Sequence, residues 1–372
     1  MKKIDLVVLS DLEHSSPRIP NLLSYLDNKI FNLYIITAEY SDSLTKDDFP
    51  VNFKQKVKIL KFKRKINFYR GLKNTFGSNL TSKTQNQRLI INLLKKIFLK
   101  VSLNILFPDQ YYFSKKRYIK IFNKEFKKKE NKIFIMSSFP YATSHVVAST
   151  IKKQNPNIKW IADYRDLWYL NQAYSHIYLR KLIDGQYERN KLKNADIITT
   201  VSIPWCKRQG DFLNKNINFI PNGYSESVNQ SHNNFKIAFD PNKKYILYVG
   251  AIYFNAQDAL LFFDSLANVN NTNFEIHFMG EFSLELDKLI NKFNLSRVVK
   301  QIGKYSRQEA HSIQLIYDSL IFFDHINDPA VLPLKFYEYI GVNKPLICIG
   351  GKDDSEPKKI LKKINRGKIL KN

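Results

Sequence analysis

Short apolar runs alternate along the chain with longer stretches in which apolar residues recur at helical spacing. β-branched and aromatic residues predominate in the runs, as is typical of strands in a parallel sheet. The predicted strands are 4–9, 33–37, 57–62, 133–137, 159–162, 197–201, 217–220, 245–249, 275–279, 298–302, 320–323 and 345–349. Strands that alternate with helices predict an α/β fold with crossover helices.

The series of strands stops at residue 220 and starts again at 245. Pro221-Asn222-Gly223 and a stretch rich in Ser and Asn lie between the two series and suit an interdomain connection. A chain of 372 residues also exceeds what one ordinary core fills. We therefore predict two Rossmann-like domains, 1–222 and 243–372, with a linker over 223–242.

The net charge of +26 is concentrated in one segment. Residues 52–132 carry 23 Lys or Arg against three acids, which accounts for 20 of the net charges. A lysine-rich bias would raise the charge everywhere, whereas the rest of the chain is nearly balanced. We expect this basic segment to bind an anionic partner, either membrane phospholipid or nucleic acid. An amphipathic helix predicted after Gln87 has a basic face, with Lys95, Lys96 and Lys100, that is either solvated or in contact with a membrane.

The hydropathy and cysteine patterns exclude several classes of protein. Nowhere do eighteen apolar residues follow one another, so we expect no membrane-spanning helix. The first apolar run is too short for a secretory signal, and Asp5 and Asp11 flank it. Cys206 and Cys348 lack the close Cys or His neighbours of a zinc site. These features predict a cytoplasmic protein with reduced cysteines.

Candidate ligand-binding residues follow the predicted strands, because ligands of open α/β sheets bind at the carboxyl ends of the strands. In the first domain these candidates are Ser16, Arg18, Asp163, Arg165 and Asp166. In the second domain they are Gly250, Gly303, Lys304, Tyr305, Leu334, Lys335 and Glu338. A helix that begins near Leu334 would place Lys335 and Glu338 on one face at its N-terminal end, where backbone amides favour a diphosphate. The alternative for this pair is an ordinary solvated Glu/Lys pair.

The spacing of residues 333–345 resembles the donor-binding motif of GT-B glycosyltransferases, in particular family 4. The motif is Pro333-x-Lys335-x-x-Glu338-Tyr339, followed by Gly341-x-x-Lys344-Pro345. Other segments match the family in order, namely Ala195-Asp196, Thr200-Val201-Ser202, Ile220-Pro221-Asn222-Gly223, Tyr248-Val249-Gly250 and Ile302-Gly303. The segment from Trp160 to Trp168, preceded by Ser137-Ser138-x-Pro140 and His145, resembles the subgroup that assembles bacterial surface polysaccharides such as capsule or lipopolysaccharide.

The resemblance implies two Rossmann-like domains that face each other across a cleft and move a hexose with retention of configuration. The donor would be a UDP- or GDP-linked sugar bound by the second domain, and the acceptor a glycan or polyprenyl-linked glycan held by the first. Lys335, Asp166 and His145 would be catalytic, and Glu338 would accept hydrogen bonds from ribose hydroxyls. We expect no bound cofactor, and no metal because the chain has no Asp-x-Asp pair. The protein would work at the inner face of the cell membrane, to which the basic segment 52–132 would bind, and no nucleic-acid partner is expected.

The sequence departs from the family pattern at several places. Ala330 stands where the family has an acid eight residues before Glu338, and the segment after Gly250 lacks the Arg and Lys that hold the diphosphate. Ser15-Ser16-Pro17 replaces a glycine pair in the first loop. We also expect the second domain to lack the terminal helix that returns to the first domain in the family.

Alternative interpretations stay open at this point. Asp163, Arg165 and Asp166 suit a structural network at a strand end as well as an acceptor site, and a lone His145 suits a scaffold. A nucleic-acid-binding protein and a catalytically silent glycosyltransferase-like scaffold are the rival functions.

Overall fold

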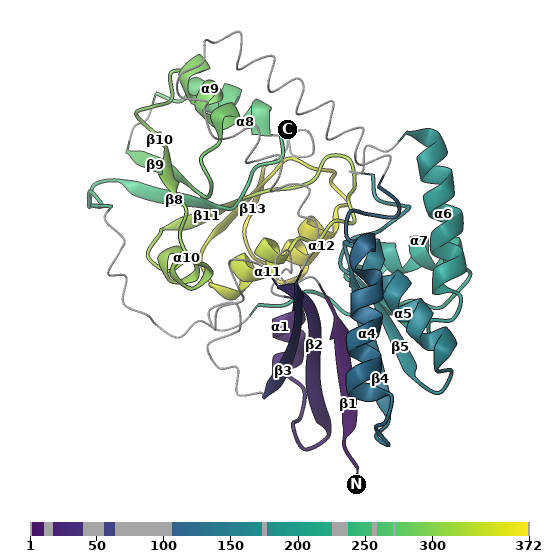
Figure 1. The fold of residues 1–372 in the computed structure, drawn as a ribbon. Helices are drawn as coiled ribbons and strands as arrows, with labels where there is room; N and C mark the ends of the chain where they lie inside the picture. Colours follow the sequence, from purple (N-terminus) through teal and green to yellow (C-terminus); the bar gives the residue numbers. More distant parts are fainter. Residues whose placement is uncertain are drawn as a thin grey trace, which may run out of the picture. The chain divides into compact units, whose positions relative to one another are not determined.

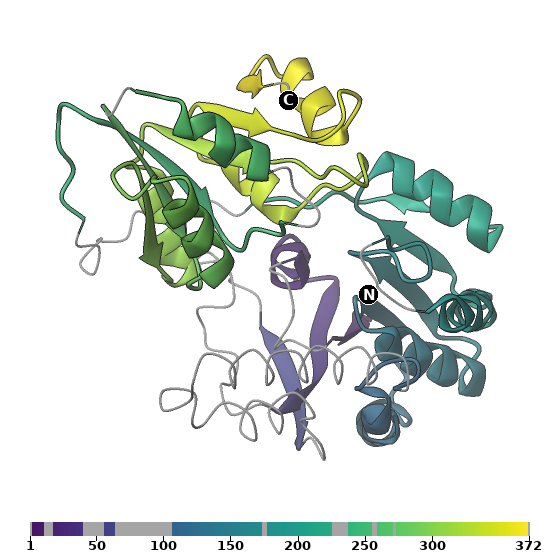
Figure 2. The same ribbon diagram turned by 90° about the horizontal axis from the view of Figure 1, so that it is seen from above.

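The computed structural model describes residues 2–10, 18–39, 56–63, 106–172, 177–224, 237–254, 259–270 and 273–370. The chain divides into two compact units, and the division falls between Ile220 and Pro221. Each unit is an α/β layer structure whose helices pack along the faces of one sheet (Figures 1 and 2). Ser16, Lys95, Lys96 and Lys100 lie outside the described residues.

The first unit contains a sheet whose seven strands are all parallel, in the order β3-β2-β1-β4-β5-β6-β7. The strands are β1 (Ile4–Leu9), β2 (Phe31–Glu39), β3 (Val57–Lys63), β4 (Ile133–Phe139), β5 (Lys159–Tyr164), β6 (Ile197–Thr200) and β7 (Asn218–Phe219). The helical segments are α1 (Arg18–Ser24), the 3-10 turn η3 (Tyr112–Ser114), α4 (Lys115–Phe126), α5 (Ala142–Gln154), α6 (Tyr178–Leu192) and α7 (Ile203–Leu213). Its first strand is apolar on both faces because helices cover both, and Val7, Val8 and Leu9 are fully buried.

The second unit contains a parallel sheet of six strands in the order β10-β9-β8-β11-β12-β13. The strands are β8 (Lys244–Val249), β9 (Phe274–Met279), β10 (Val299–Gly303), β11 (Ser319–Phe323), β12 (Leu346–Ile349) and β13 (Lys368–Leu370). The helices are α8 (Ala259–Ala267), α9 (Leu284–Lys292), α10 (Arg307–Gln314), α11 (Leu334–Gly341) and α12 (Glu356–Lys363). One core holds Phe263 and Ile290 of α8 and α9, and the other holds Ile313, Phe336 and Leu361 of α10, α11 and α12.

Both strand orders are those of doubly wound Rossmann-like sheets, so the predicted fold class is confirmed. Every predicted strand is present with small changes at its ends. The second sheet also contains one strand, β13, that was not predicted from the sequence. This edge strand has three residues, and Lys368 and Leu370 are exposed, so it lacks the continuous apolar run that marks the other strands. Within the described residues, no helix is both long and apolar enough to cross a membrane.

Candidate active site

Glycines end three neighbouring strands of the second sheet at its carboxyl edge. Gly250 follows β8 with φ 98°, Gly280 follows β9, and Gly303 ends β10 with φ 85°. A Cβ atom on Gly280 would lie 3.1 Å from the carbonyl oxygen of Gly250, tighter than ordinary contact. The strand ends are also tied together, since the Gly280 amide donates to the Gly303 carbonyl at 2.9 Å. This edge therefore presents backbone without side chains, which allows a ligand to approach it closely.

Helix α11 begins at the same edge and is the next helix after β11, with Pro333 directly before its first residue. Pro333 has extended backbone angles at the N-cap, and the helix buries Phe336 and Tyr339 completely against the sheet. That burial leaves Lys335 and Glu338, three residues apart, on the partly exposed side near the helix start. The sequence prediction for the position of this pair agrees with the structure, while their roles in donor binding stay predictions.

The Lys335 ammonium lies over the ring of Tyr248, the penultimate residue of β8. Its Nζ is 4.4 Å from the ring centroid, donates to the Tyr248 hydroxyl at 2.5 Å, and is 3.4 Å from the Ala251 carbonyl. The Tyr248 hydroxyl in turn donates to the same carbonyl at 2.8 Å. Burial lowers the pKa of Lys335 to about 7, although the nearby Glu338 opposes this change. No carboxylate of the described residues pairs directly with the ammonium, so its charge is available to an anionic ligand.

Glu338 is paired with Arg307, the first residue of α10. The Arg307 Nη2 and Nε donate to Oε1 of Glu338 at 3.1 and 3.3 Å. The two side chains are 32% and 15% exposed, so the pair is partly shielded from water. Arg307 was not among the residues predicted from the sequence. The sequence pattern that could have identified it is Ser306-x-x-Glu309. This capping box indicates that a helix begins at Arg307, shortly after the end of a strand.

The other residues that the sequence placed in the donor site lie around this edge. Lys304 is exposed, and its Nζ donates to Glu281 at 3.0 Å. Tyr305 is half-buried against the core that holds α11, and Leu334 is half-buried at the start of α11.

A buried acid adds to the same edge and was also missed. Asp324 follows β11 and is fully buried, and its Oδ2 accepts a 2.5 Å hydrogen bond from the hydroxyl of Ser355, the N-cap of α12. Burial raises the pKa of Asp324 to about 6. A Cβ on Gly351, which has φ 69°, would lie 2.4 Å from that same Oδ2. Asp324 therefore fastens the end of β11 to the start of α12.

Arg18 and Asp163, two residues predicted to bind the acceptor, form a buried ion pair in the first unit. Arg18 Nη2 and Nε donate to the Asp163 carboxylate at 2.7 and 3.0 Å, and Nη2 also donates to the Ile220 carbonyl. The hydroxyls of Thr199 and Ser138 donate to the same carboxylate at 2.7 and 3.3 Å. This network ties the start of α1 to the ends of β4, β5 and β6, so both residues have a structural role. Their contact with an acceptor stays a prediction.

Arg165 and Asp166 lie just beyond the end of β5, nearer to solvent. Arg165 Nε donates to Asp166 Oδ2 at 3.2 Å, and the Asp166 side chain is 39% exposed. This exposed carboxylate at the carboxyl end of a strand can receive a hydrogen bond from a ligand.

His145, predicted as catalytic, is fully buried in α5. Its Nδ1 shares a 2.7 Å hydrogen bond with the Ser137 hydroxyl, which also accepts from the Trp160 indole at 2.7 Å. Burial lowers the pKa of His145 to about 3, so the ring is neutral at physiological pH. In this structure the ring belongs to the packing of the sheet, and its catalytic role stays a prediction.

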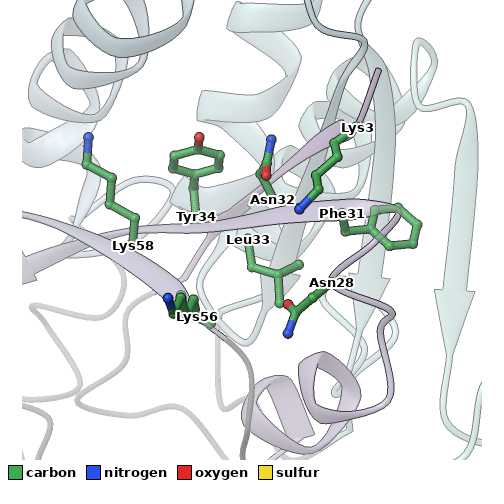
Figure 3. Close-up of a pocket in the computed structure, with 9 residues that line it drawn as sticks. Lys3, Asn28, Phe31, Asn32, Leu33, Tyr34, Lys56 and Lys58 are labelled. Carbon is green, nitrogen blue, oxygen red and sulfur yellow. The ribbon is translucent and has the colours of Figure 1, made fainter. Parts of the chain in front are cut away.

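A cavity of about 570 Å³ lies at the opposite, amino edge of the first sheet. Figure 3 shows Asn32, Tyr34 and Lys58 projecting from the same side of strands β2 and β3, with Lys3, which precedes β1, beside them. Lys58 pairs with Glu125 of α4 at 2.9 Å. The cavity is basic, and it lacks the glycine strand ends and helix starts of the second unit's carboxyl edge.

Comparisons with known proteins establish the architecture. No protein-family model matches the sequence, and no curated protein matches it significantly. The lipopolysaccharide outer core galactosyltransferase WaaB matches with a TM-score of 0.56 at 13% identity, over 99% of this chain and 85% of that chain. Anabaena HepE, solved in complex with UDP and glucose, matches with a TM-score of 0.55 at 10% identity, over 97% and 89%.

A variant of TarM from S. aureus, solved with fondaparinux, alpha-GlcNAc-glycerol and UDP, matches with a TM-score of 0.57 at 12% identity, over 100% of this chain and 90% of that chain. Identities this low establish a shared fold and nothing finer. The two doubly wound parallel sheets and these matches show that the chain has the GT-B fold of glycosyltransferases.

Proposed function

We propose that this protein is a glycosyltransferase that binds a nucleotide-sugar donor at the carboxyl edge of the second sheet. The observation that carries the proposal is the placement of the Lys335 ammonium in the first turn of α11, next to the segment that follows Gly250 and without a carboxylate partner among the described residues. A cation in a first turn is unfavourable by itself, and an anion there is favourable. A diphosphate would supply that anion and would use the close backbone approach that glycine allows.

The residues take distinct roles in this proposal. Lys335 stabilises the negative charge that grows on the departing diphosphate, and Glu338 accepts a hydrogen bond from ribose. The acceptor hydroxyl forms the new bond to the anomeric carbon while the bond to the diphosphate breaks. The leaving diphosphate takes the hydroxyl proton, and the sugar keeps its configuration, as the resemblance to family 4 implies.

The donor in this proposal is a UDP-linked hexose. The HepE and TarM structures, which share the fold, were both solved with UDP. A GDP-linked hexose is the alternative that a donor panel distinguishes.

The acceptor in this proposal is a glycan or polyprenyl-linked glycan of cell-surface polysaccharide synthesis, held by the first unit. The exposed carboxylate of Asp166, oriented by Arg165, is the group best placed there to accept a hydrogen bond from a sugar hydroxyl.

Two surfaces of the first unit support a peripheral membrane location. The exposed residues of α4 include Lys116, Lys120 and Lys124. The solvent side of the first two turns of α6 is apolar, since Tyr178 and Leu179 are 78% and 65% exposed. The exposed apolar side chains in and next to α6 are Ile177, Tyr178, Leu179, Leu182 and Ile183. A basic surface combined with exposed apolar side chains is typical of proteins that bind an anionic membrane interface.

Vesicle sedimentation tests the membrane contact. We expect the protein to pellet with anionic vesicles and not with neutral ones, and we expect added salt to release it. Reversal of Lys116, Lys120 and Lys124 to Glu should weaken binding strongly, since each Lys near anionic lipid contributes about 1 kcal/mol.

The control for that experiment carries the same charge change in the second unit, at the exposed Lys288, Lys292 and Lys363. This control should pellet like the parent. Equal loss of binding in both variants would show that net charge alone, and not the α4 surface, attracts the protein.

A donor panel tests the enzymatic proposal. Purified protein is incubated with UDP- and GDP-linked hexoses and a lipid-linked acceptor extract, and the released nucleoside diphosphate is measured. Release that depends on the acceptor supports transfer. Nucleotide binding without turnover would indicate a catalytically silent scaffold, and binding of oligonucleotides in place of nucleotide sugars would indicate the nucleic-acid-binding alternative.

A further inference from the structure

The Arg307–Glu338 ion pair joins the first turn of α10 to α11 through only one of the two carboxylate oxygens of Glu338. Both guanidinium nitrogens that reach the carboxylate donate to the same oxygen, Oε1, at 3.1 and 3.3 Å. The structure records no hydrogen bond to Oε2 from any described residue. The carboxylate therefore has one oxygen held by protein and one with its lone pairs available.

Local helix energetics do not explain why an arginine occupies position 307. The helix start is already capped, because the Ser306 hydroxyl accepts from the Glu309 amide and the Glu309 carboxylate accepts from the Ser306 amide. A cation in the first turn opposes the helix dipole. The side chain of Arg307 is thus placed against local preference and is compensated by a carboxylate 31 residues away. Departures of this kind concentrate at functional sites.

His311, one helical turn after Arg307 in α10, does not replace Arg307 as the partner of Glu338. His311 lies close enough for the charges of Glu338 and Arg307 to affect its pKa, and burial lowers that pKa. Its two ring nitrogens are buried and form no hydrogen bond with the described residues. A neutral His311 does not neutralise the carboxylate, so among the described residues Arg307 alone forms an ion pair with Glu338.

We propose that Arg307 is a positioning residue that fixes the Glu338 carboxylate so that Oε2 accepts a hydrogen bond from one hydroxyl of the donor's ribose. This inference rests on the nucleotide-sugar site proposed above and assigns a determinant of its specificity. Arg307 fixes the rotamer of Glu338 and offsets the repulsion between that carboxylate and the donor's diphosphate. Because Oε1 is already engaged, one ribose hydroxyl should matter much more than the other.

Titration calorimetry with UDP, 2′-deoxy-UDP and 3′-deoxy-UDP tests the inference. The parent should bind UDP about tenfold or more tightly than one of the deoxy analogues, as expected for a hydrogen bond to a charged group, and should discriminate much less against the other. In Arg307→Ala that ratio should fall to about 1–3, since the carboxylate is no longer fixed. Arg307→Lys keeps the charge but loses the planar pair of donors, so its ratio should be intermediate.

The matched control is Lys244→Ala, which removes a Lys–Asp ion pair at the amino end of β8 in the same unit. This variant should keep the parent's affinity and its discrimination between UDP and the analogues. Thermal melts establish whether each variant is folded. If Arg307→Ala does not fold, a parental ratio in folded Arg307→Lys overturns the inference, and a reduced ratio supports it.

The outcomes separate the inference from the function on which it rests. A parent that binds no UDP overturns the UDP-sugar site and the positioning role with it. A parent that binds UDP and discriminates, while folded Arg307→Ala discriminates equally well, overturns the positioning role alone.

Discussion

Nucleoside-diphosphate binding to this protein should weaken as the pH rises from 7 to 9, because Lys335 must be protonated to neutralise the diphosphate. Burial lowers the pKa of Lys335 from 10.5 to about 7 in the free protein, although the nearby Glu338 opposes this change. A diphosphate beside Nζ stabilises the charged form and raises that pKa again. Binding therefore takes up a proton whenever the free lysine is neutral.

The size of the effect follows from the two pKa values. With a pKa of about 7, half of the free protein carries protonated Lys335 at pH 7 and about 1% does at pH 9. If the bound form stays protonated up to pH 9, affinity falls about 50-fold across this range, or about 2.3 kcal/mol. Below pH 7 the free lysine is already protonated, so this contribution levels off there. The terminal phosphate, with a pKa of about 6, adds little dependence above pH 7.

The assay is titration calorimetry with UDP at pH 7, 8 and 9, each in two buffers of different ionisation enthalpy so that proton uptake is measured directly. Lys335→Met keeps the aliphatic stem and removes the titrating group. That variant should bind weakly at pH 7 and should show no proton uptake from this position. Equal pH dependence in the parent and in Lys335→Met, or unchanged affinity of the parent from pH 7 to 9, would refute the reasoning.

Three further changes have defined expected outcomes. Glu338→Gln should reduce UDP affinity by about 1.5–3 kcal/mol through the lost charge-assisted hydrogen bond, and calorimetry that finds parental affinity would contradict its contact with ribose. Arg18→Ala should destabilise the first unit by about 3–5 kcal/mol in denaturant unfolding, because it leaves the buried Asp163 charge without its guanidinium partner; a change below 1 kcal/mol would argue against that pair. Gly351→Ala should lower thermal stability by about 1–3 kcal/mol, since the new Cβ meets the buried carboxylate of Asp324 at left-handed backbone angles, and an unchanged melting temperature would contradict this contact.

The sheets were predictable because their strands are continuous apolar runs between turn residues. Strand β13 was not, because an edge strand of three residues with exposed ends carries no such pattern. The sequence also placed Lys335 and Glu338 at the start of a helix after a strand end, since Pro333 and the buried positions 336 and 339 fix where that helix begins.

Side-chain contacts between residues far apart in sequence could not be predicted from local sequence patterns. Arg18 and Asp163 are 145 residues apart, and only the folded sheet shows that they form one buried network. The capping box is compatible with a helix that begins at Arg307. No residue near Arg307 in the sequence indicates that Glu338 is its ion-pair partner. The contact of Lys335 with the Tyr248 ring, 87 residues earlier in the sequence, is likewise one that a motif does not encode.

A structure of the protein in complex with UDP tests the central proposal most directly. We predict that the diphosphate lies within hydrogen-bonding distance of Lys335 Nζ and of the first amides of α11, with a ribose hydroxyl on Glu338 and the backbone of Gly250 and Gly303 against the ligand. UDP bound elsewhere, for example in the basic cavity at the amino edge of the first sheet, or an edge left empty at saturating UDP, would contradict the proposed donor site.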